Sequence, residues 1–421
     1  MKKMLSILLE EFKENLPDTY DSVERKIQFS NIPKMINVAI GMRRSGKTYL
    51  IYQKIRELIS QGISLDQILF INFEDDRLLP MKQKELSELL ENFYTLYPQN
   101  HDKKCYFFLD EIQNVDGWPL VIRRFYDSKK VQIFLTGSSA KLLSKEIATS
   151  LRGRSISTEV WPYSFQEYCE AHNIKRPKPP IGKKIIDQFN MHFNNYFSIG
   201  GFPAIQHLHE NERRTILQGY INTVIFRDII ERYKITNTVL IKYLIKTLIK
   251  NVAQPFAVHK FYNDIKSQGY KISKDTIYQY MEYIEDAFLI FSVPIFSESL
   301  RKTQLNPKRI YVNDNGLVCA NRLSISQQLG SLFENQIYLD LRRQNKKVKY
   351  YITQDGYEID FVVENRDGSF ELIQAVWDIS DPKTLQRELR ALEQAEKELK
   401  IKGRIITPKD YIVEYLKENQ F

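Results

Sequence analysis

The sequence contains little cysteine, glycine or proline, and it lacks a long hydrophobic run. Its three cysteines lie far apart among 421 residues, which excludes a disulfide framework or a cysteine-rich zinc site and predicts a cytoplasmic protein. With only 16 glycines and 15 prolines, collagen-like and low-complexity chains are excluded. No segment approaches the roughly 20 apolar residues of a membrane span, so we expect no membrane partner. The apolar run Met4–Leu9 is followed by two glutamates, which favours an amphipathic helix over an export signal.

The composition is that of a globular protein, with 43% hydrophobic and 27% charged residues, and the length predicts two or three domains. Lys and Arg number 61 against 52 Asp and Glu, a net charge of +9. Much of this excess falls in residues 231–310, which hold 13 basic and 7 acidic residues, whereas residues 311–421 hold 16 and 18. Such a cluster is typical of a nucleic-acid-binding surface, but a lysine-rich solvated surface explains it equally well.

The most specific pattern is Gly41–Thr48, with the sequence GMRRSGKT, which matches G-x-x-x-x-G-K-[ST] at every required position. Residues 34–40 before it are predicted to form a buried strand, and residues 48–59 after it a helix. Strand, glycine loop and helix together form a P-loop, in which backbone N–H groups and the helix N-terminus face a phosphate. We expect Lys47 to reach the β- and γ-phosphates and the Thr48 hydroxyl to bind Mg²⁺. The predicted nucleotide-contacting residues are Gly41, Met42, Arg43, Arg44, Ser45, Gly46, Lys47, Thr48 and Tyr49.

A second apolar segment, Cys105–Leu109, is followed by two carboxylates, Asp110 and Glu111. So apolar a run is typical of a strand inside a parallel sheet, and ligands bind beyond the carboxyl ends of such strands. We expect Asp110 to coordinate Mg²⁺ through water or Thr48, and Glu111 to polarise the attacking water. Two acids after a strand could instead form a solvated turn, but their place downstream of a P-loop favours the catalytic role.

Three more positions are candidates for catalysis. The predicted strand Val131–Leu135 is followed by Thr136 and Ser138, which could sense the γ-phosphate and orient water, although the same residues are good turn formers. Arg154, with Arg152 as a second choice, could be supplied by a neighbouring subunit of a homo-oligomer to stabilise transition-state charge. A surface arginine without that role is the simpler alternative for each.

The middle of the chain predicts a DNA-binding module. Residues 239–293 combine helix, short turn and capped helix with a following strand, which is the order of a winged helix. Double-stranded DNA would then be contacted within residues 258–300, near Lys271 and Lys274. Winged helices also serve as packing or protein-contact modules, and both uses stay open.

The last hundred residues are predicted to be α/β. Glu334 on a helix and Asp360 on a strand are two of the carboxylates with which a nuclease fold holds Mg²⁺ for phosphodiester cleavage. The third position, where such a site needs an acid followed two residues later by lysine, reads Gln374-Ala375-Val376. Two carboxylates alone make a weak metal site, so an inactive nuclease-like fold is the favoured interpretation.

Taken together, the motifs resemble those of the bacterial and archaeal AAA-type ATPases that carry a C-terminal domain of unknown function. The segments with this resemblance span nearly the whole chain and are Gly41–Thr48, Phe73–Leu78, Leu109–Glu111, Leu151–Arg154, Gly200–Pro203 and Tyr357–Phe361. The resemblance implies an α/β fold with a parallel P-loop sheet and flanking helices, then a winged helix and a PD-(D/E)xK-like module. The domains it implies are 1–165 (ATPase), 166–237 (helical connection), 238–310 (winged helix) and 311–421 (nuclease-like, inactive).

The resemblance also implies ATP rather than GTP as the nucleotide. We therefore predict a cytoplasmic, Mg²⁺-dependent enzyme that hydrolyses ATP to ADP and phosphate. An ATP-gated DNA-binding switch and an ATPase-coupled nuclease are the alternatives.

Overall fold

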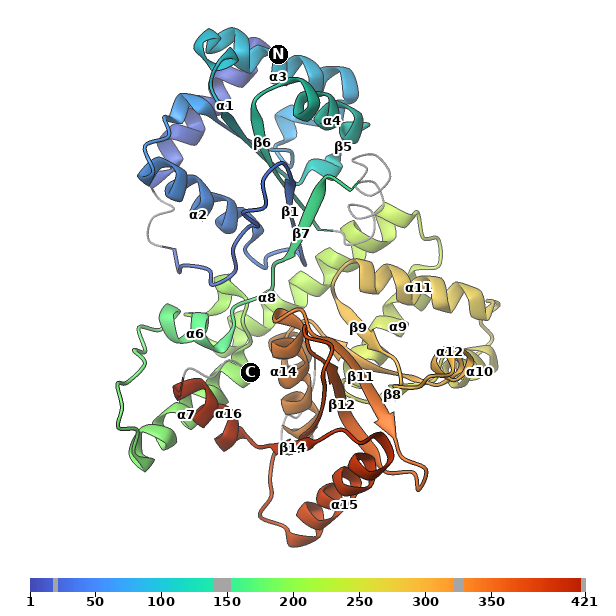
Figure 1. Ribbon diagram of the computed structural model, residues 1–421. Helices are drawn as coiled ribbons and strands as arrows, with labels where there is room; N and C mark the ends of the chain where they lie inside the picture. The colour runs from blue at the N-terminus through green and yellow to red at the C-terminus, as the bar shows by residue number, and fades with distance from the viewer. Residues whose placement is uncertain (18–21, 139–152, 322–328, 418–421) are drawn as a thin grey trace. The chain divides into compact units, whose positions relative to one another are not determined.

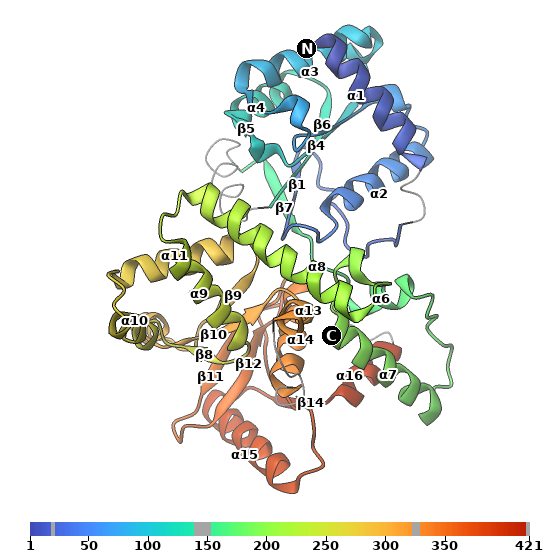
Figure 2. The same ribbon diagram turned by 180° about the vertical axis from the view of Figure 1, so that it is seen from behind.

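The computed structural model describes residues 1–17, 22–138, 153–321 and 329–417 (Figures 1 and 2). The chain divides into two compact units, Met1–Trp161 and Pro162–Phe421. Among the described residues, no helix combines the length and the apolar character that crossing a membrane requires.

The first unit is built on a five-stranded sheet in which every pairing is parallel. In spatial order its strands are β2 (Ile68–Asn72), β4 (Cys105–Asp110), β6 (Val131–Gly137), β1 (Ile36–Ile40) and β7 (Ser155–Glu159). The three central strands are apolar because both faces of the sheet are covered. A small parallel pair, β3 (Met81–Lys82) and β5 (Val115–Asp116), lies outside this sheet. The predicted P-loop fold is confirmed.

Helices cover both faces of this sheet, as Figures 1 and 2 show. The helices of this unit are α1 (Lys2–Asn15), α2 (Lys47–Ser60), α3 (Gln83–Leu96) and α4 (Trp118–Ser128). On one face, Phe12 of α1 and Ile51 of α2 belong to the same core cluster as Phe108 of β4. On the other, Phe107 of β4 contacts Phe93 of α3, with ring centroids 5.3 Å apart. Adjacent residues of β4 therefore serve opposite layers, as the alternation of a strand requires.

The second unit begins with helices. They are α6 (Phe165–Ala171), α7 (Lys183–Ile199), α8 (Glu210–Thr223), the π-helix η7 (Val224–Glu231) and α9 (Thr238–Lys250). The helix that begins at Glu210 is thus α-helical to Thr223 and continues directly as a π-helix.

The family motif Gly200–Pro203 connects α7 to the following turn and is explained by packing. Gly200 has φ +85°, and a Cβ atom there would lie 2.1 Å from Asp314 Oδ1. A Cβ atom on Gly201 would lie 2.3 Å from the Tyr163 carbonyl oxygen. Asp314 accepts hydrogen bonds from the N–H groups of Gly201 (2.7 Å) and Gly316 (2.8 Å). The motif therefore fixes the contact of three backbone segments.

Two further sheets complete this unit. The first is ordered β8 (Pro255–Phe256), β10 (Lys308–Val312) and β9 (Ile290–Val293), and it accompanies α10 (Val258–Ser267), α11 (Lys274–Asp286) and the short α12 (Leu300–Leu305). The second is ordered β11 (Lys347–Ile352), β12 (Glu358–Glu364), β13 (Phe370–Ala375) and β14 (Gly403–Ile406). Its helices are α13 (Asn315–Ala320), α14 (Leu329–Arg343), α15 (Pro382–Leu399) and α16 (Pro408–Leu416). Only the β13–β14 pairing in these two sheets is parallel.

Candidate active site

The glycine loop lies between the carboxyl end of β1 and the first turn of α2. Gly46 precedes α2 with a left-handed backbone, φ 98°, which glycine adopts without steric cost. Gly41 is required for a different reason: a Cβ atom there would lie 2.2 Å from the carbonyl oxygen of Val160. The loop is therefore pressed against the chain that follows β7, and a side chain at position 41 would push it out of place.

A buried lysine occupies the centre of this loop. The Lys47 Nζ atom donates to the carbonyl oxygens of Gly41 (3.1 Å) and Met42 (3.2 Å), and it lies 3.3 Å from Glu111 Oε1. The Ser45 hydroxyl is also buried and has no hydrogen-bond partner among the described residues. A cation, an unsatisfied hydroxyl and the positive end of α2 together fit a phosphate group.

Two threonine hydroxyls, one in the first turn of α2 and one on β6, contact the end of β4. The Thr48 hydroxyl donates to Asp110 Oδ2 at 2.7 Å. The Thr136 hydroxyl at the end of β6 donates to the other oxygen of Asp110 and accepts from the Glu111 N–H group at 2.9 Å. Burial, followed by the charge of Glu111, raises the pKa of Asp110 to about 6, and both hydroxyls oppose that rise. The parallel sheet brings all four residues to one edge because they follow the carboxyl ends of neighbouring strands.

Glu111 is held in one orientation from both sides. Its backbone is left-handed, φ 52°, which is uncommon outside glycine and turns the chain sharply after β4. Lys47 contacts Oε1, and Gln113 Nε2 donates to Oε2 at 2.5 Å. Burial raises the pKa of Glu111, but the charges of Lys47 and then Arg43 act in the opposite direction. The net result is a Glu111 pKa below its ordinary value. The carboxylate is therefore anionic and able to accept a proton.

The Thr48 hydroxyl and the Asp110 carboxylate are oxygen ligands of the kind that Mg²⁺ binds, and because they are hydrogen-bonded at 2.7 Å, both could hold one cation. No cluster of three His, Cys, Asp or Glu side chains suited to a metal occurs in the described ranges. A cation held here would therefore take its remaining ligands from phosphate oxygens and water, which is usual for Mg²⁺.

The other predicted site residues are placed differently. Ser138 is buried directly after β6, Met42 is buried, and Tyr49 is half exposed. Arg154 forms an ion pair with Asp127 of α4. Ser155, the residue after Arg154, pairs with Ile36, the first residue of β1. Arg154 therefore lies at the amino end of the parallel strands, whereas the P-loop follows their carboxyl end. A role in a neighbouring subunit stays a prediction, and Arg152 lies outside the described residues.

Sequence reasoning missed two residues of this region. Gln113 orients Glu111, and its proximity in sequence could have indicated this. Arg25 is buried and donates to the carbonyl oxygens of Ser45 (2.8 Å) and Trp161 (2.6 Å), so it fixes the loop from a segment that precedes β1. Nothing in the local sequence distinguishes Arg25 from a surface arginine.

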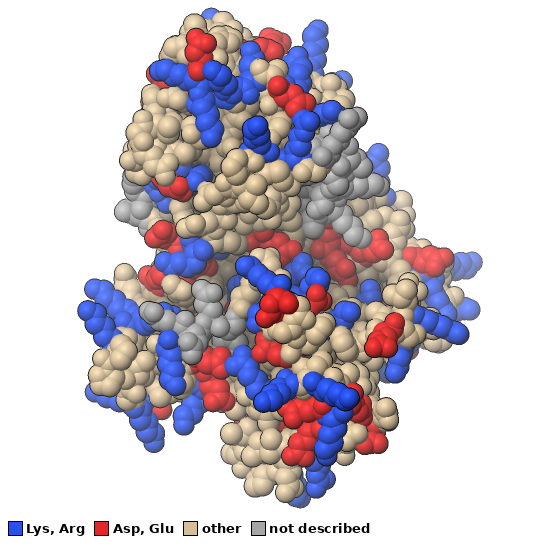
Figure 3. Space-filling model, in the orientation of Figure 1, with Lys and Arg blue, Asp and Glu red and all other residues tan. Residues whose placement is uncertain are grey.

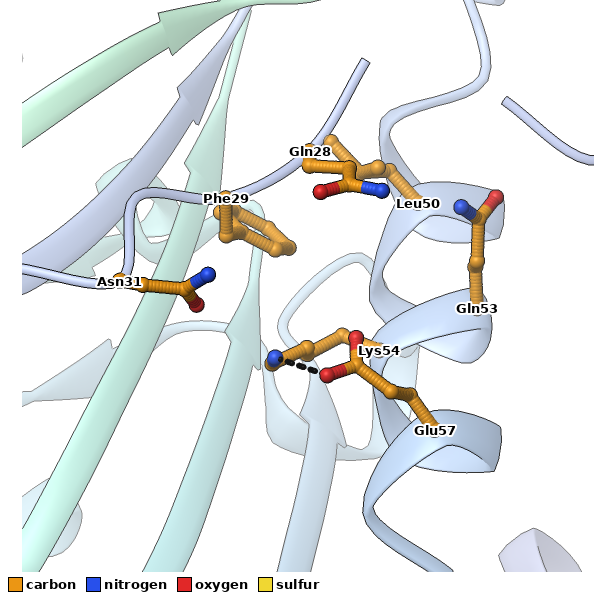
Figure 4. Close-up of a pocket in the computed structure, with 7 residues that line it drawn as sticks. All are labelled: Gln28, Phe29, Asn31, Leu50, Gln53, Lys54 and Glu57. Atoms are coloured by element: carbon orange, nitrogen blue, oxygen red, sulfur yellow. Dashed lines mark hydrogen bonds and ion pairs between the residues drawn. The ribbon is translucent and has the colours of Figure 1, made fainter. Parts of the chain in front are cut away.

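A pocket of about 100 Å³ lies between this preceding segment and α2 (Figure 4). Its lining residues are Gln28, Phe29, Asn31, Leu50, Gln53, Lys54 and Glu57. No residue of Gly41–Thr48 lines it, so it is separate from the phosphate-binding loop.

The predicted DNA-contacting surface contains the N-terminus of α11. The Ser273 hydroxyl caps this helix by accepting from the Thr276 N–H group at 3.2 Å. Lys271, Lys274 and Tyr278 are exposed on or beside the helix. On the face drawn in Figure 3, basic side chains are interspersed with acidic ones rather than gathered over one element.

Comparison with known proteins finds two matching family models and several related sequences. Residues 33–169 match the family model of an AAA domain, and residues 190–331 match that of a domain of unknown function, DUF8612. The uncharacterized protein MJ1544 of Methanocaldococcus jannaschii is 37% identical over 400 residues, which cover 92% of this chain and 85% of that protein. An uncharacterized protein of Haemophilus influenzae is 30% identical over 349 residues, covering 82% and 83% of the two chains.

Among solved structures, the walker-type ATPase paby2304 of Pyrococcus abyssi has a TM-score of 0.46 and 15% identity. The match covers 74% of this chain and 95% of that one.

Proposed function

Because the chain belongs to the same family as MJ1544 and carries an AAA domain, we propose that it is a Mg²⁺-dependent ATPase of the cytoplasm that hydrolyses ATP to ADP and phosphate. The observation that supports this most strongly is the group formed by the buried residues Lys47, Asp110 and Glu111 with the partly buried Thr48, joined by contacts of 2.7 to 3.3 Å. These are the residue types that phosphoryl transfer to water requires.

In this proposal each side chain has a separate task. Lys47 neutralises phosphate charge, and Thr48 and Asp110 hold Mg²⁺. When bound, Mg²⁺ supplies further charge neutralisation at the phosphates. Glu111 accepts a proton from the attacking water. Thr136 positions both acidic residues through its hydrogen bonds to the Asp110 carboxylate and the Glu111 N–H group.

In this proposal Lys47 exchanges partners. Lys47 is paired with Glu111, and this pairing lowers the pKa of Glu111. When Lys47 turns to a phosphate, the carboxylate loses that neighbour and its proton affinity rises. The base is therefore strengthened only when the substrate is present.

ATP turnover measured across a protein dilution series, with and without DNA, tests this function. We expect phosphate release that is far slower in Glu111→Gln. Specific activity that falls on dilution would support an arginine supplied by a second subunit, and activity independent of dilution would remove that role from Arg154.

A second candidate, an ATP-gated DNA-binding switch, is favoured by the arrangement around α11. The order α9, β8, α10, α11, β9, β10 with the sheet order β8-β10-β9 is that of a winged helix, in which α11 would enter a major groove. We therefore also propose domains 166–237, 238–310 and 311–421 within the second unit.

Neutralising Lys271 and Lys274 together tests this candidate. We expect salt-dependent binding to duplex DNA that Lys271→Gln with Lys274→Gln weakens and makes less salt-dependent. The matched control is Lys397→Gln with Lys400→Gln, at the end of α15. Equal binding by both double variants would contradict the assignment of α11.

A further inference from the structure

A buried arginine lies among three carboxylates in the second unit. Arg309 belongs to β10, Glu334 to α14, and Glu358 and Asp360 to β12. The Arg309 Nη1 atom lies 2.6 Å from Glu334 Oε1 and 2.8 Å from Asp360 Oδ1, and Nη2 lies 2.5 Å from Glu358 Oε2. One guanidinium therefore occupies the point on which the carboxylates converge.

The carboxylates have further partners, whereas the buried Arg309 Nε atom has no hydrogen-bond partner among the described residues. The Tyr311 hydroxyl donates to Glu334 Oε1 at 2.7 Å, and the Ala375 N–H group donates to Asp360 Oδ2 at 3.0 Å. Gln374 accepts from the Asp360 N–H group at 3.1 Å and donates to Glu388 Oε2 at 2.7 Å. The amide at position 374, where a nuclease needs an acid, thus bridges strand β12 and helix α15.

Burial of the cluster strengthens the electrostatic interaction between the Arg309 guanidinium and the carboxylates. The side chains of Arg309, Glu334 and Asp360 are only 5%, 10% and 9% exposed, so water screens their charges little. Two carboxylates this close repel each other, and a cation that lies between them offsets that repulsion. Arg309 supplies that cation from a strand of the neighbouring sheet, and it thereby joins β10 to α14 and β12.

The divalent metal that the nuclease resemblance implies does not fit this arrangement. In both predicted ligands, Glu334 and Asp360, one carboxylate oxygen already accepts a hydrogen bond from Arg309. No metal-suited group of three acidic, His or Cys side chains is found in the part of the chain that the structure describes. A metal ion would have to displace the guanidinium from within the cluster.

We infer that Arg309 takes the place of the divalent cation, so that the C-terminal module binds no metal there and cleaves no phosphodiester bond. The carboxylates that resemble a catalytic centre serve instead to hold two sheets together. This assignment concerns the second unit alone and does not depend on ATP hydrolysis.

Terbium luminescence of the nucleotide-free full-length protein tests the inference. Tyr311 touches Glu334 and would sensitise a Tb³⁺ ion bound there. We expect the wild-type protein and Glu334→Gln to give the same emission. Arg309→Ala should add about one equivalent of Tb³⁺ binding, which Glu334→Gln in the same chain removes. Arg309→Lys, which keeps the charge, should add none.

Wild-type emission that Glu334→Gln abolishes would overturn the inference, as would a folded Arg309→Ala protein without added binding. Should Arg309→Ala fail to fold, the comparison of wild type with Glu334→Gln still decides the question. Plasmid nicking with Mn²⁺ gives an independent readout: we expect none from the wild type. Nicking that Asp360→Asn removes would contradict the assignment.

Discussion

Replacing Thr136 by valine removes one buried hydroxyl while keeping the shape of the side chain. That hydroxyl donates to Asp110 and accepts from the Glu111 N–H group at 2.9 Å. It also opposes the rise of the Asp110 pKa, which burial and Glu111 bring to about 6. In Thr136→Val we expect the Asp110 pKa to rise further, so that this proposed metal ligand is protonated over a wider pH range.

The size of the effect follows from the lost contact. A hydrogen bond to a charged group contributes about 1.5–3 kcal/mol, which corresponds to roughly 10- to 100-fold in turnover near pH 6. The loss should shrink toward pH 8, where the carboxylate is ionised again. Thr136→Ser keeps the hydroxyl and is the matched control.

The assay is the pH dependence of ATP turnover at saturating Mg²⁺. We expect the acidic limb of the profile to move to higher pH in Thr136→Val and to stay in place in Thr136→Ser. A uniform loss at every pH, with an unmoved limb, would refute this reasoning and favour a direct contact of Thr136 with the γ-phosphate.

Three further outcomes are expected. Gly201→Ala should destabilise the protein by about 1–3 kcal/mol, because its Cβ would meet the Tyr163 carbonyl, whereas Gly219→Ala in α8, with open space around it, should be neutral or stabilising in thermal unfolding. Burial raises the Asp314 pKa from its ordinary value of 3.8 to about 6 in the folded protein. The stabilisation that protonated Asp314 contributes is therefore complete below pH 3.8 and is lost as the pH rises from 3.8 through about 6. Asp314→Asn should flatten the change of Tm between these two pH values. Gln113→Leu should lower kcat more than it changes KM, and an equal kcat would exclude a positioning role.

Local patterns were sufficient to predict the P-loop fold. The apolar runs before Gly41 and Asp110 predicted buried parallel strands, and polar residues after each strand predicted a common edge. The structure brings Lys47, Thr48, Asp110, Glu111 and Thr136 into contact, as those patterns led us to expect.

Contacts between distant segments could not be predicted in this way. Arg309 contacts Asp360, which lies 51 residues later in the chain. From the local sequence alone, an arginine at this position of a β-strand is indistinguishable from a solvent-exposed charge on an edge strand. Gly200 and Gly201 lie in a segment that the resemblance singles out, but the contacts that require glycine come from distant segments: a Cβ atom on Gly200 would meet Asp314, more than a hundred residues later, and one on Gly201 would meet the Tyr163 carbonyl oxygen. Arg154 follows β4 and β6 in sequence, yet the parallel pairing of β7 with β1 puts it at the end of the sheet opposite the P-loop.

Calorimetric titration with Mg²⁺·ATP tests the central claim most directly, using Lys47→Ala and Glu111→Gln beside the wild type. We predict one bound ATP per chain in Glu111→Gln with very slow turnover, and no measurable binding in Lys47→Ala. Equal binding by Lys47→Ala, or turnover of Glu111→Gln at the wild-type rate, would contradict the account.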